Sequence, residues 1–240
     1  MTLSQVDSTN NYAKNELAKS APLPEGTVIL AEHQFAGRGQ INNTWESEPG
    51  KNLTFSILLN PSFLSVDKQF MLNKAISIGI NDALAGIIGN GVKIKWPNDI
   101  YINDQKLGGI LIENIIQGTK WKHAIVGIGL NINQTDFPPY LKNATSVKKI
   151  IGHDHGISSI LSEICKGIEA WYLQLKALKF DEINKRYLEL MYRLNELHLF
   201  RAEGTEKQGK IVSVEDSGLL NVDFLGNHRT FGFKEIEFVI

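Results

Sequence analysis

Hydrophobic and polar positions follow two periods along this chain. Apolar residues recur at the spacing of one helix face over 65–88, 158–175 and 181–194, and Ser65, Ser158 and Asp181 are the expected N-caps. Short apolar runs bounded by turn residues predict strands over 27–32, 53–59, 92–96, 100–102 and 121–131, with a further strand opened by Lys106. A short helix over 11–19 follows Ser8 or Thr9 as its cap. These elements predict an α+β fold.

From Arg201 onward the pattern changes to four short strands, expected over 209–215, 219–224, 229–233 and 235–239. Turn residues separate them at 216–218 and 226–227. A sheet of this size is too small to be stable alone, so it should dock on the rest of the chain. We therefore expect two domains, residues 1–198 and residues 199–240.

Composition excludes several classes of protein. Hydrophobic residues make up 42% and charged residues 21%, and the net charge of −1 gives no basic surplus for binding nucleic acid. No apolar run approaches the roughly 20 residues of a membrane-spanning helix, and the first residues lack the features of a signal peptide. The single cysteine, Cys165, falls on the apolar stripe of a predicted helix and suits a reducing compartment. These features predict a cytoplasmic protein without membrane partners.

The most informative stretch is VKIKWPNDIYINDQKLGGILIE, residues 92–113. Pro97 ends the first strand, so Asn98 and Asp99 follow at the break. Lys106 opens another strand, in which Gly108-Gly109 allows close packing against the backbone. Lysine, amide and carboxylate groups on adjoining strands suit an anionic substrate. The simpler interpretation, a hairpin with solvated charges, is preferred only for Lys93, Asp104 and Gln105.

A second informative stretch is the long segment 32–52, EHQFAGRGQINNTWESEPGKN, which contains almost no aliphatic residues. So long a segment without regular structure inside a domain is typical of a functional loop. Gly37-Arg38-Gly39 would bring the backbone close to a ligand, and the guanidinium would be available for a phosphate or carboxylate.

KWPND followed by KLGGILIE, together with the Ser-Thr-Asn at 8–10, EHQFAGRG and GIGLNIN, resembles the signature of biotin protein ligases. This family activates biotin with ATP and attaches it to lysines of carrier proteins. The resemblance covers nearly the whole chain. It implies a mixed, largely antiparallel sheet flanked by helices, like class II aminoacyl-tRNA synthetases and biotin–lipoate ligases, with a small C-terminal SH3-like β-barrel.

The resemblance also implies roles for individual residues. The catalytic group would be Arg38, Lys95, Asp99 and Lys106. The biotin-binding residues would be Ser8, Thr9, Asn10, Gln34, Gly37, Arg38, Lys106 and Gly109. The ATP-binding residues would be Arg38, Trp45, Asn98, Lys106 and Asn131, with Asn131 also a ligand of magnesium. For Asp99 two roles stay open, service to the incoming lysine and positioning of magnesium.

The implied activity is ATP- and Mg²⁺-dependent formation of biotinyl-5′-AMP and transfer of biotin to a lysine of the biotin carboxyl carrier protein of acetyl-CoA carboxylase or a related carboxylase. Only seven residues precede Ser8, so we expect no DNA-binding segment. Both a monomer and a homodimer are compatible with the sequence.

Gln40 stands where the family commonly has a basic run that holds the adenylate. Two alternatives remain, a lipoate–protein ligase and a non-catalytic biotin or nucleotide sensor.

Overall fold

Two β-sheets organise the chain in this computed structural model, which describes residues 1–21, 23–40 and 43–239. The larger sheet has seven strands in the order β1-β2-β3-β7-β6-β5-β4. Its strands are β1 (Thr2–Val6), β2 (Val28–Gln34), β3 (Leu53–Leu59), β4 (Val92–Lys95), β5 (Asp99–Ile102), β6 (Gln105–Gln117) and β7 (Lys120–Leu130). Only β1 and β2 pair in parallel; the other neighbours are antiparallel. The expected mixed, largely antiparallel sheet is confirmed.

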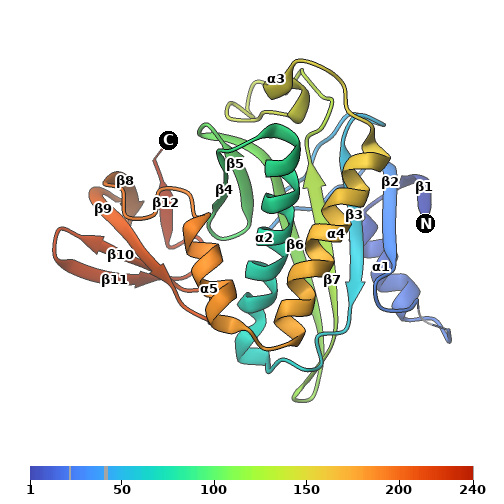
Figure 1. The fold of residues 1–240 in the computed structure, drawn as a ribbon, viewed down its shortest axis with the longest axis horizontal. Coiled ribbons are helices and arrows are strands. Elements are labelled where there is room, and N and C mark those ends of the chain that lie inside the picture. Colours follow the sequence, from blue (N-terminus) through green and yellow to red (C-terminus); the bar gives the residue numbers. More distant parts are fainter. Residues whose placement is uncertain (22, 41–42, 240) are drawn as a thin grey trace.

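The helices divide the sheet into a packed face and an open face. They are α1 (Thr9–Leu17), α2 (Gln69–Ile88), α3 (Val147–Ile151), α4 (Ile157–Lys176) and α5 (Phe180–Glu189), with a 3₁₀ turn at Val66–Lys68 before α2. In Figure 1, α2, α4 and α5 lie on the near face of the sheet, and α1 lies behind it. Within the described residues, no helix is both long enough and apolar enough to cross a membrane.

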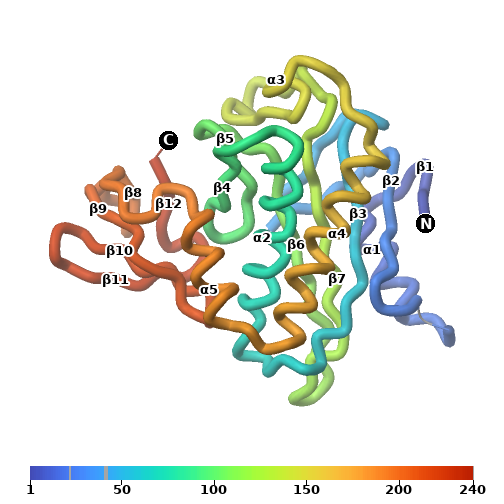
Figure 2. Tube along the Cα trace, in the orientation of Figure 1, coloured from blue at the N-terminus to red at the C-terminus, as the bar shows by residue number. Residues whose placement is uncertain are grey.

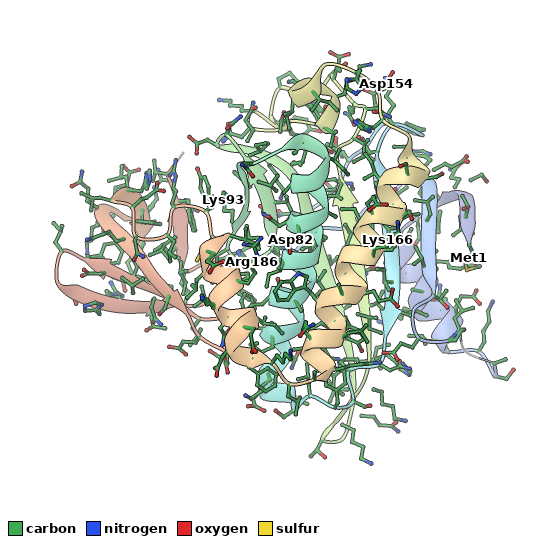
Figure 3. All side chains as sticks on the ribbon, in the orientation of Figure 1. Met1, Asp82, Lys93, Asp154, Lys166 and Arg186 are labelled. Carbon is green, nitrogen blue, oxygen red and sulfur yellow. The ribbon has the colours of Figure 1, made fainter. Side chains whose placement is uncertain are left out.

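The packed face forms the core because α2 is buried on nearly all sides between the sheet and α4. The two helices run side by side (Figure 2) and touch at Gly79 and Gly167, where a Cβ on either glycine would lie within 2.6 Å of the other's carbonyl oxygen. Arg186 on α5 completes this layer with an ion pair of 2.6 Å to Asp82 on α2 (Figure 3). The helical layer of α2, α4 and α5 therefore covers one face of the sheet and leaves the opposite face for a site.

Ser65 is the N-cap of the 3₁₀ turn, while α2 itself has Lys68 as its N-cap. The other two expected N-caps, of α4 and α5, were wrong. Helix α4 has Gly156 as its N-cap, so Ser158 lies inside the first turn. Helix α5 has Lys179 as its N-cap, and Asp181 lies in the first turn, where its carboxylate complements the helix dipole. Capping residues and first-turn acidic residues produce similar sequence signals, which explains both errors.

The C-terminal residues form a five-stranded antiparallel sheet in the order β11-β10-β9-β8-β12, the expected SH3-like domain. Its strands are β8 (His198–Ala202), β9 (Thr205–Val214), β10 (Leu220–Phe224), β11 (Asn227–Phe231) and β12 (Ile236–Phe238). Only four strands were expected, since β8 is short and half polar. The sheet lies beside α5 at one end of the molecule, and the N-terminus lies at the other (Figure 1). The division at residue 198 stays a prediction.

Candidate active site

The open face of the large sheet has a floor almost free of side chains. Cross-strand pairing places Thr54, Gly129, Gly109 and Asp99 in one row across β3, β7, β6 and β5. The next row joins Ser56 to Gly127 and Leu111. A Cβ on Gly129 would lie 2.3 Å from the Trp45 ring, and one on Gly127 would lie 2.4 Å from Asn10 Oδ1. These glycines are therefore required for Trp45 and Asn10 to lie directly on the sheet.

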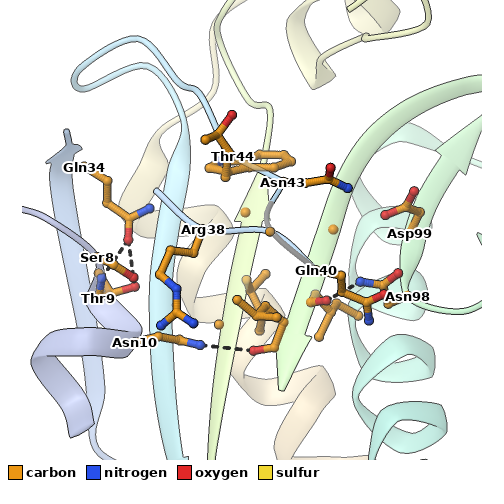
Figure 4. A pocket seen from close by; sticks show the side chains of 18 of the residues that line it. Ser8, Thr9, Asn10, Gln34, Arg38, Gln40, Asn43, Thr44, Asn98 and Asp99 are labelled. Carbon is orange, nitrogen blue, oxygen red and sulfur yellow. Dashed lines mark hydrogen bonds between the residues drawn. The ribbon is translucent and has the colours of Figure 1, made fainter. Parts of the chain in front are cut away.

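Above this floor lies a cavity of about 760 Å³, its open mouth included. Its polar lining comes from α1, β2, the loop after β2, and the β5–β6 hairpin. In Figure 4, Ser8, Thr9, Asn10 and Gln34 approach from one side, Asn98 and Asp99 from the other, and Arg38 lies between them. The cavity therefore has two chemically different ends.

At the first end, hydroxyl and amide groups form one hydrogen-bonded network. Gln34 Oε1 accepts from the backbone N–H and the hydroxyl of Thr9, at 2.7 and 3.0 Å. Ser56 Oγ lies 2.7 Å from Thr9 Oγ1 and 2.6 Å from Asn10 Oδ1. Ser8 occupies the N-cap of α1 without making a side-chain cap, and it is buried. This end presents neutral donors and acceptors in fixed directions.

Glu113 sets the direction of the Asn10 amide. Asn10 Nδ2 donates to the Leu111 carbonyl at 3.2 Å and to Glu113 Oε2 at 2.8 Å, so its Oδ1 faces Ser56 and the sheet floor. Glu113 also holds Arg38, whose Nη2 lies 3.0 Å from Oε1. Asn11 Oδ1 accepts from Arg38 Nη1 at 2.7 Å. One carboxylate therefore orients an amide at the first end and the guanidinium in the middle.

At the second end, Lys106 and Asp99 form an ion pair, with Nζ 2.7 Å from Oδ1. The Lys106 backbone donates to Asn143 O at 2.6 Å, and its carbonyl accepts from Thr145 N at 2.9 Å, so the segment 143–145 fixes the start of β6. Asn98 is tied to β6 because its side-chain amide donates to the Ile110 carbonyl and its own carbonyl accepts from Ile110 N. This end presents one ammonium and one carboxylate beside the Asn98 amide, and the strands that carry them are held by backbone contacts.

The cavity brings together most of the residues expected at the site. Ser8, Thr9, Asn10, Gln34, Arg38, Trp45, Asn98, Asp99, Lys106 and Gly109 line it, and so does Gln40. Ile41 and Asn42, the residues after Gln40 in the expected adenylate-holding position, lie outside the described residues. Gly37, Lys95 and Asn131 do not line the cavity.

Lys95 lies on the same face of the sheet, one strand beyond Asp99, its cross-strand partner. Its ammonium lies 3.3 Å from the Tyr101 hydroxyl and over the rings of Tyr101 and Phe238. Burial lowers the pKa of Lys95, while Asp99 acts in the opposite direction. In this arrangement Lys95 contributes positive charge next to the cavity, and the catalytic role expected of it stays a prediction.

Asn131 and Gly37 support the walls of the site. Asn131 is buried, and its Nδ2 donates to the Thr145 carbonyl at 3.0 Å, which ties the end of β7 to the segment that fixes Lys106. A Cβ on Gly37 would lie 2.2 Å from the Trp45 carbonyl oxygen, and the Trp45 N–H donates to Gly37 O at 2.9 Å. The contacts expected of these two residues with ligands also stay predictions.

Sequence reasoning assigned no role to Ser56 or Glu113. Ser56 is completely buried in a strand whose other residues are mostly aliphatic, and Thr54 precedes it at the period of two. Glu113 continues the alternation Gly109, Leu111, Glu113 on the cavity face of β6. In both strands the period-two spacing was a usable signal, because it places these polar groups on one face.

Trp45 carries a polar group with no protein partner. Its indole N–H is buried above Gly129, lines the cavity region and donates to no acceptor among the described residues. A buried donor without a partner costs about 1–3 kcal/mol, so it favours a ligand that supplies an acceptor.

Comparisons with known proteins agree with this geometry. Residues 2–131 match the model of the biotin/lipoate A/B protein ligase family. The chain is 30% identical to the biotin–[acetyl-CoA-carboxylase] ligase of Paracoccus denitrificans, covering 91% of each sequence. It is 33% identical to the bifunctional ligase/repressor BirA of Bacillus subtilis, covering 90% of this chain and 66% of that protein's length.

Among solved structures, the biotin protein ligase of Aquifex aeolicus in complex with biotin and ATP superposes with a TM-score of 0.82 at 28% identity, covering 99% of this chain and 97% of the other. That agreement extends over both sheets, so it includes the C-terminal domain. The chain therefore belongs to the biotin/lipoate A/B protein ligase family, on its biotin protein ligase branch.

Proposed function

We propose that this protein activates biotin with ATP to biotinyl-5′-AMP and transfers the biotinyl group to a lysine of a biotin carboxyl carrier protein domain. The observation that carries the proposal is the polarity of one cavity. Its first end offers neutral hydrogen-bonding groups, and its second end offers Lys106 and Asp99, with Arg38 between. Biotin has the matching polarity, with a neutral ureido ring at one end and a carboxylate at the other.

The first end suits the ureido group, which has two N–H donors and one carbonyl acceptor. Asn10 Oδ1 is turned toward the cavity floor by its contacts with Glu113 and Ser56, so it can accept from a ureido N–H. The Ser8 hydroxyl lines this end and can donate to the ureido oxygen, whereas the Thr9 hydroxyl already donates to Gln34 Oε1. A site with fixed polar groups rejects analogues that leave those groups unpaired, which favours biotin over the dithiolane ring of lipoate.

In the first step, an oxygen of the biotin carboxylate attacks the α-phosphorus of ATP. A new P–O bond forms, the bond to the β-phosphate oxygen breaks, and pyrophosphate leaves; no proton transfer is needed. Both reactants are anions, so positioning and charge stabilisation dominate the catalysis. Lys106 and Arg38 supply that charge, and the ion pair with Asp99 fixes the direction of the Lys106 ammonium along the sheet floor.

In the second step, the neutral ε-amine of a carrier lysine attacks the acyl carbon of the mixed anhydride, and AMP leaves as the C–O bond breaks. The attacking amine loses a proton. Asp99 is the one carboxylate among the described lining residues, and it can orient the incoming lysine or accept that proton. If Asp99 serves only transfer, Asp99→Asn should still form the adenylate and transfer it slowly. Single-turnover measurement of each step separates this role from metal positioning, which predicts equal loss in both.

Magnesium is the metal that we propose for the first step. Mg²⁺ usually binds one or two carboxylates together with substrate phosphates and water, and the cavity offers Asp99 with the amide oxygens of Asn98 and Asn43. The described residues contain no group of three or more His, Cys, Asp or Glu that would hold a metal alone. This donor set fits an ion carried by ATP, and it favours Asp99 over Asn131 as the protein ligand. When bound, the ion neutralises charge on the phosphates.

The proposed carrier is the biotin carboxyl carrier protein of acetyl-CoA carboxylase or a related enzyme, since the name of the Paracoccus relative includes acetyl-CoA carboxylase. We also propose a cytoplasmic location. The single cysteine supports it, since Cys165 is free and cannot form a disulfide within the chain, as is usual in a reducing compartment.

One assay tests the proposed function, the biotin-dependent exchange of labelled pyrophosphate into ATP. We expect exchange with biotin and none with lipoate. Exchange that depends on lipoate would instead identify a lipoate–protein ligase. Binding of biotin without any exchange would identify a sensor.

A further inference from the structure

The indole of Trp96 connects the active site with the C-terminal domain. Trp96 lies between β4 and β5 and is 4% exposed. Its N–H donates to the carbonyl of Gly218 at 2.9 Å, and its ring lies 5.4 Å from the ring of Phe233. Both partners belong to the C-terminal residues, so the polar group and one side of this tryptophan are satisfied from outside the catalytic sheet.

The segment that presents the Gly218 carbonyl is the β9–β10 turn, residues 214–218. Lys74 on α2 is buried, and its ammonium donates to the carbonyls of Val214 and Glu215, each at 3.1 Å. Gly218 has a φ of +93° and lies against Phe70, where a Cβ would come within 2.7 Å of the ring. The turn is thus fixed against α2 at both ends, and the direction of its last carbonyl is set.

Helix α5 holds the middle of the same turn. Asn184 accepts from Lys74 Nζ at 2.8 Å and donates to Asp216 Oδ1 at 3.1 Å. The β9–β10 turn therefore contacts two helices of the catalytic domain, and these contacts are hydrogen bonds with defined directions. A C-terminal domain that only added a binding surface would not need hydrogen bonds that fix this turn against the catalytic domain.

Along the chain, Trp96 is followed within three residues by Asn98 and Asp99, which line the cavity. Asn98 exchanges two hydrogen bonds with Ile110 on β6, and Asp99 pairs with Lys106. A shift of the Trp96 backbone would therefore be carried into the positions of Asn98 and Asp99. Misplacement of reacting groups by about 1 Å can cost roughly 100-fold in rate.

We propose that the β9–β10 turn positions the second end of the cavity through Trp96, so that Trp96 and Gly218 are positioning residues for adenylation. The inference rests on the proposed function, since it concerns the rate of that step. It assigns the C-terminal domain a specific contribution: one carbonyl, held by α2 and α5, that fixes the strand end from which Asn98 and Asp99 project. The positions of Thr9 and Gln34, at the first end of the cavity, should not depend on this contact.

The test compares Trp96→Phe with Trp121→Phe. Each change keeps an aromatic ring and removes one buried indole–carbonyl hydrogen bond, since Trp121 Nε1 donates to His123 O at 3.0 Å at the far end of β7, outside the cavity lining. We expect kcat for exchange to fall roughly 10- to 100-fold in Trp96→Phe, with an unchanged KM for biotin. Trp121→Phe should lose a similar amount of stability in urea unfolding and retain its kcat.

A second variant, Phe233→Leu, removes the ring that packs against Trp96. The Phe233 side chain is 44% exposed, so this variant should still fold. It should lower kcat in the same direction as Trp96→Phe. Equal kcat values for Trp96→Phe and Trp121→Phe, with Phe233→Leu unchanged, would overturn the proposal. If the wild-type protein shows no exchange, the proposed function fails, and the effect of the Trp96 contact on the cavity is measured as ATP affinity by calorimetry. Weaker ATP binding only in Trp96→Phe would support the positioning role of Trp96. Equal ATP binding in all variants would overturn that role.

Discussion

Lys106 Nζ lies 2.7 Å from Asp99 Oδ1, and both side chains project from the same face of the β5–β6 hairpin into the cavity. The two residues are not direct cross-strand partners, because Asp99 pairs with Gly109 and Lys106 pairs with Tyr101. Gly109 leaves open the space beside both groups, since a Cβ there would lie 3.2 Å from Asp99 Oδ1 and 3.6 Å from Lys106 Nζ. The pair therefore borders the Gly109 position of the floor, which no side chain of its own fills.

The first prediction is that Lys106→Ala abolishes adenylation and keeps the fold. Loss of one preorganised donor costs about 10²–10³ in rate, and loss of a full charge beside two anions should cost at least that. The fold should persist, because the side chain is partly exposed and such ion pairs contribute about 0–1 kcal/mol. Lys93→Ala is the matched control, since Lys93 lies on β4, next to the β5–β6 hairpin and outside the cavity. Exchange activity within about threefold of wild type would refute the role.

The second prediction concerns Glu113, which orients Asn10 and pairs with Arg38. Glu113→Gln removes the charge and permits the Asn10 amide to turn, so the KM for biotin should rise about tenfold, as expected for a lost hydrogen bond to a charged group. The KM for ATP should change less. Glu203→Gln, which breaks an exposed pair with Arg229 in the C-terminal sheet, is the control. Steady-state exchange kinetics give both constants, and an unchanged KM for biotin would exclude an orienting role.

A third prediction follows from Gln40, which lines the cavity. Gln40→Arg should slow the release of biotinyl-5′-AMP about 10- to 100-fold, because a guanidinium forms a charge-assisted bond worth about 1.5–3 kcal/mol. The two nearby cations already have carboxylate partners, Glu113 for Arg38 and Glu48 for Lys51, so either would have to leave its partner to replace the missing charge. Rapid dilution of preformed adenylate measures the rate, with Gln117→Arg at the far end of β6 as control. Unchanged release would mean that other contacts close the loop.

The fourth prediction is a pH dependence of stability from Lys74. Burial lowers the pKa of Lys74 to about 8, with Asp216 acting against the shift. Between pH 8 and 10 the unfolded chain keeps the proton that the folded chain has lost, so raising the pH favours the folded state, by about 1 kcal/mol per pH unit. Urea unfolding should show this rise in wild type and not in Lys74→Met. Parallel pH profiles for the two proteins would contradict it.

The motifs were predictable from sequence because each is local. Ser8 to Asn10, Gln34, Arg38 and the pair Asn98–Asp99 each lie within a few residues of a glycine, proline or cap signal that sets the local backbone. The resemblance supplied their common role, which stays a prediction, and these residues line one cavity. Sequence reasoning succeeded where the chemistry and the backbone signal occupy the same short segment.

Contacts between distant strands could not be predicted in the same way. The row Thr54, Gly129, Gly109 and Asp99 depends on strand order and register, which no single segment specifies. Lys95 is an example. Its alternation with Lys93 along the strand was predicted correctly, but its ammonium lies over the rings of Tyr101 and Phe238, and Phe238 belongs to the last strand of the chain. The hydrogen bond from Trp96 to Gly218 spans 122 positions and has no local signal.

The most direct test of the account is a single turnover without carrier protein. Equimolar protein, biotin and ATP labelled at the α-phosphate are mixed with Mg²⁺, and the labelled products are separated. We predict that the label appears as biotinyl-5′-AMP at up to one equivalent per protein, with matching release of pyrophosphate and none of either with lipoate. Label that stays in ATP, or that passes to ADP through cleavage between the β- and γ-phosphates, would contradict activation of biotin in this cavity.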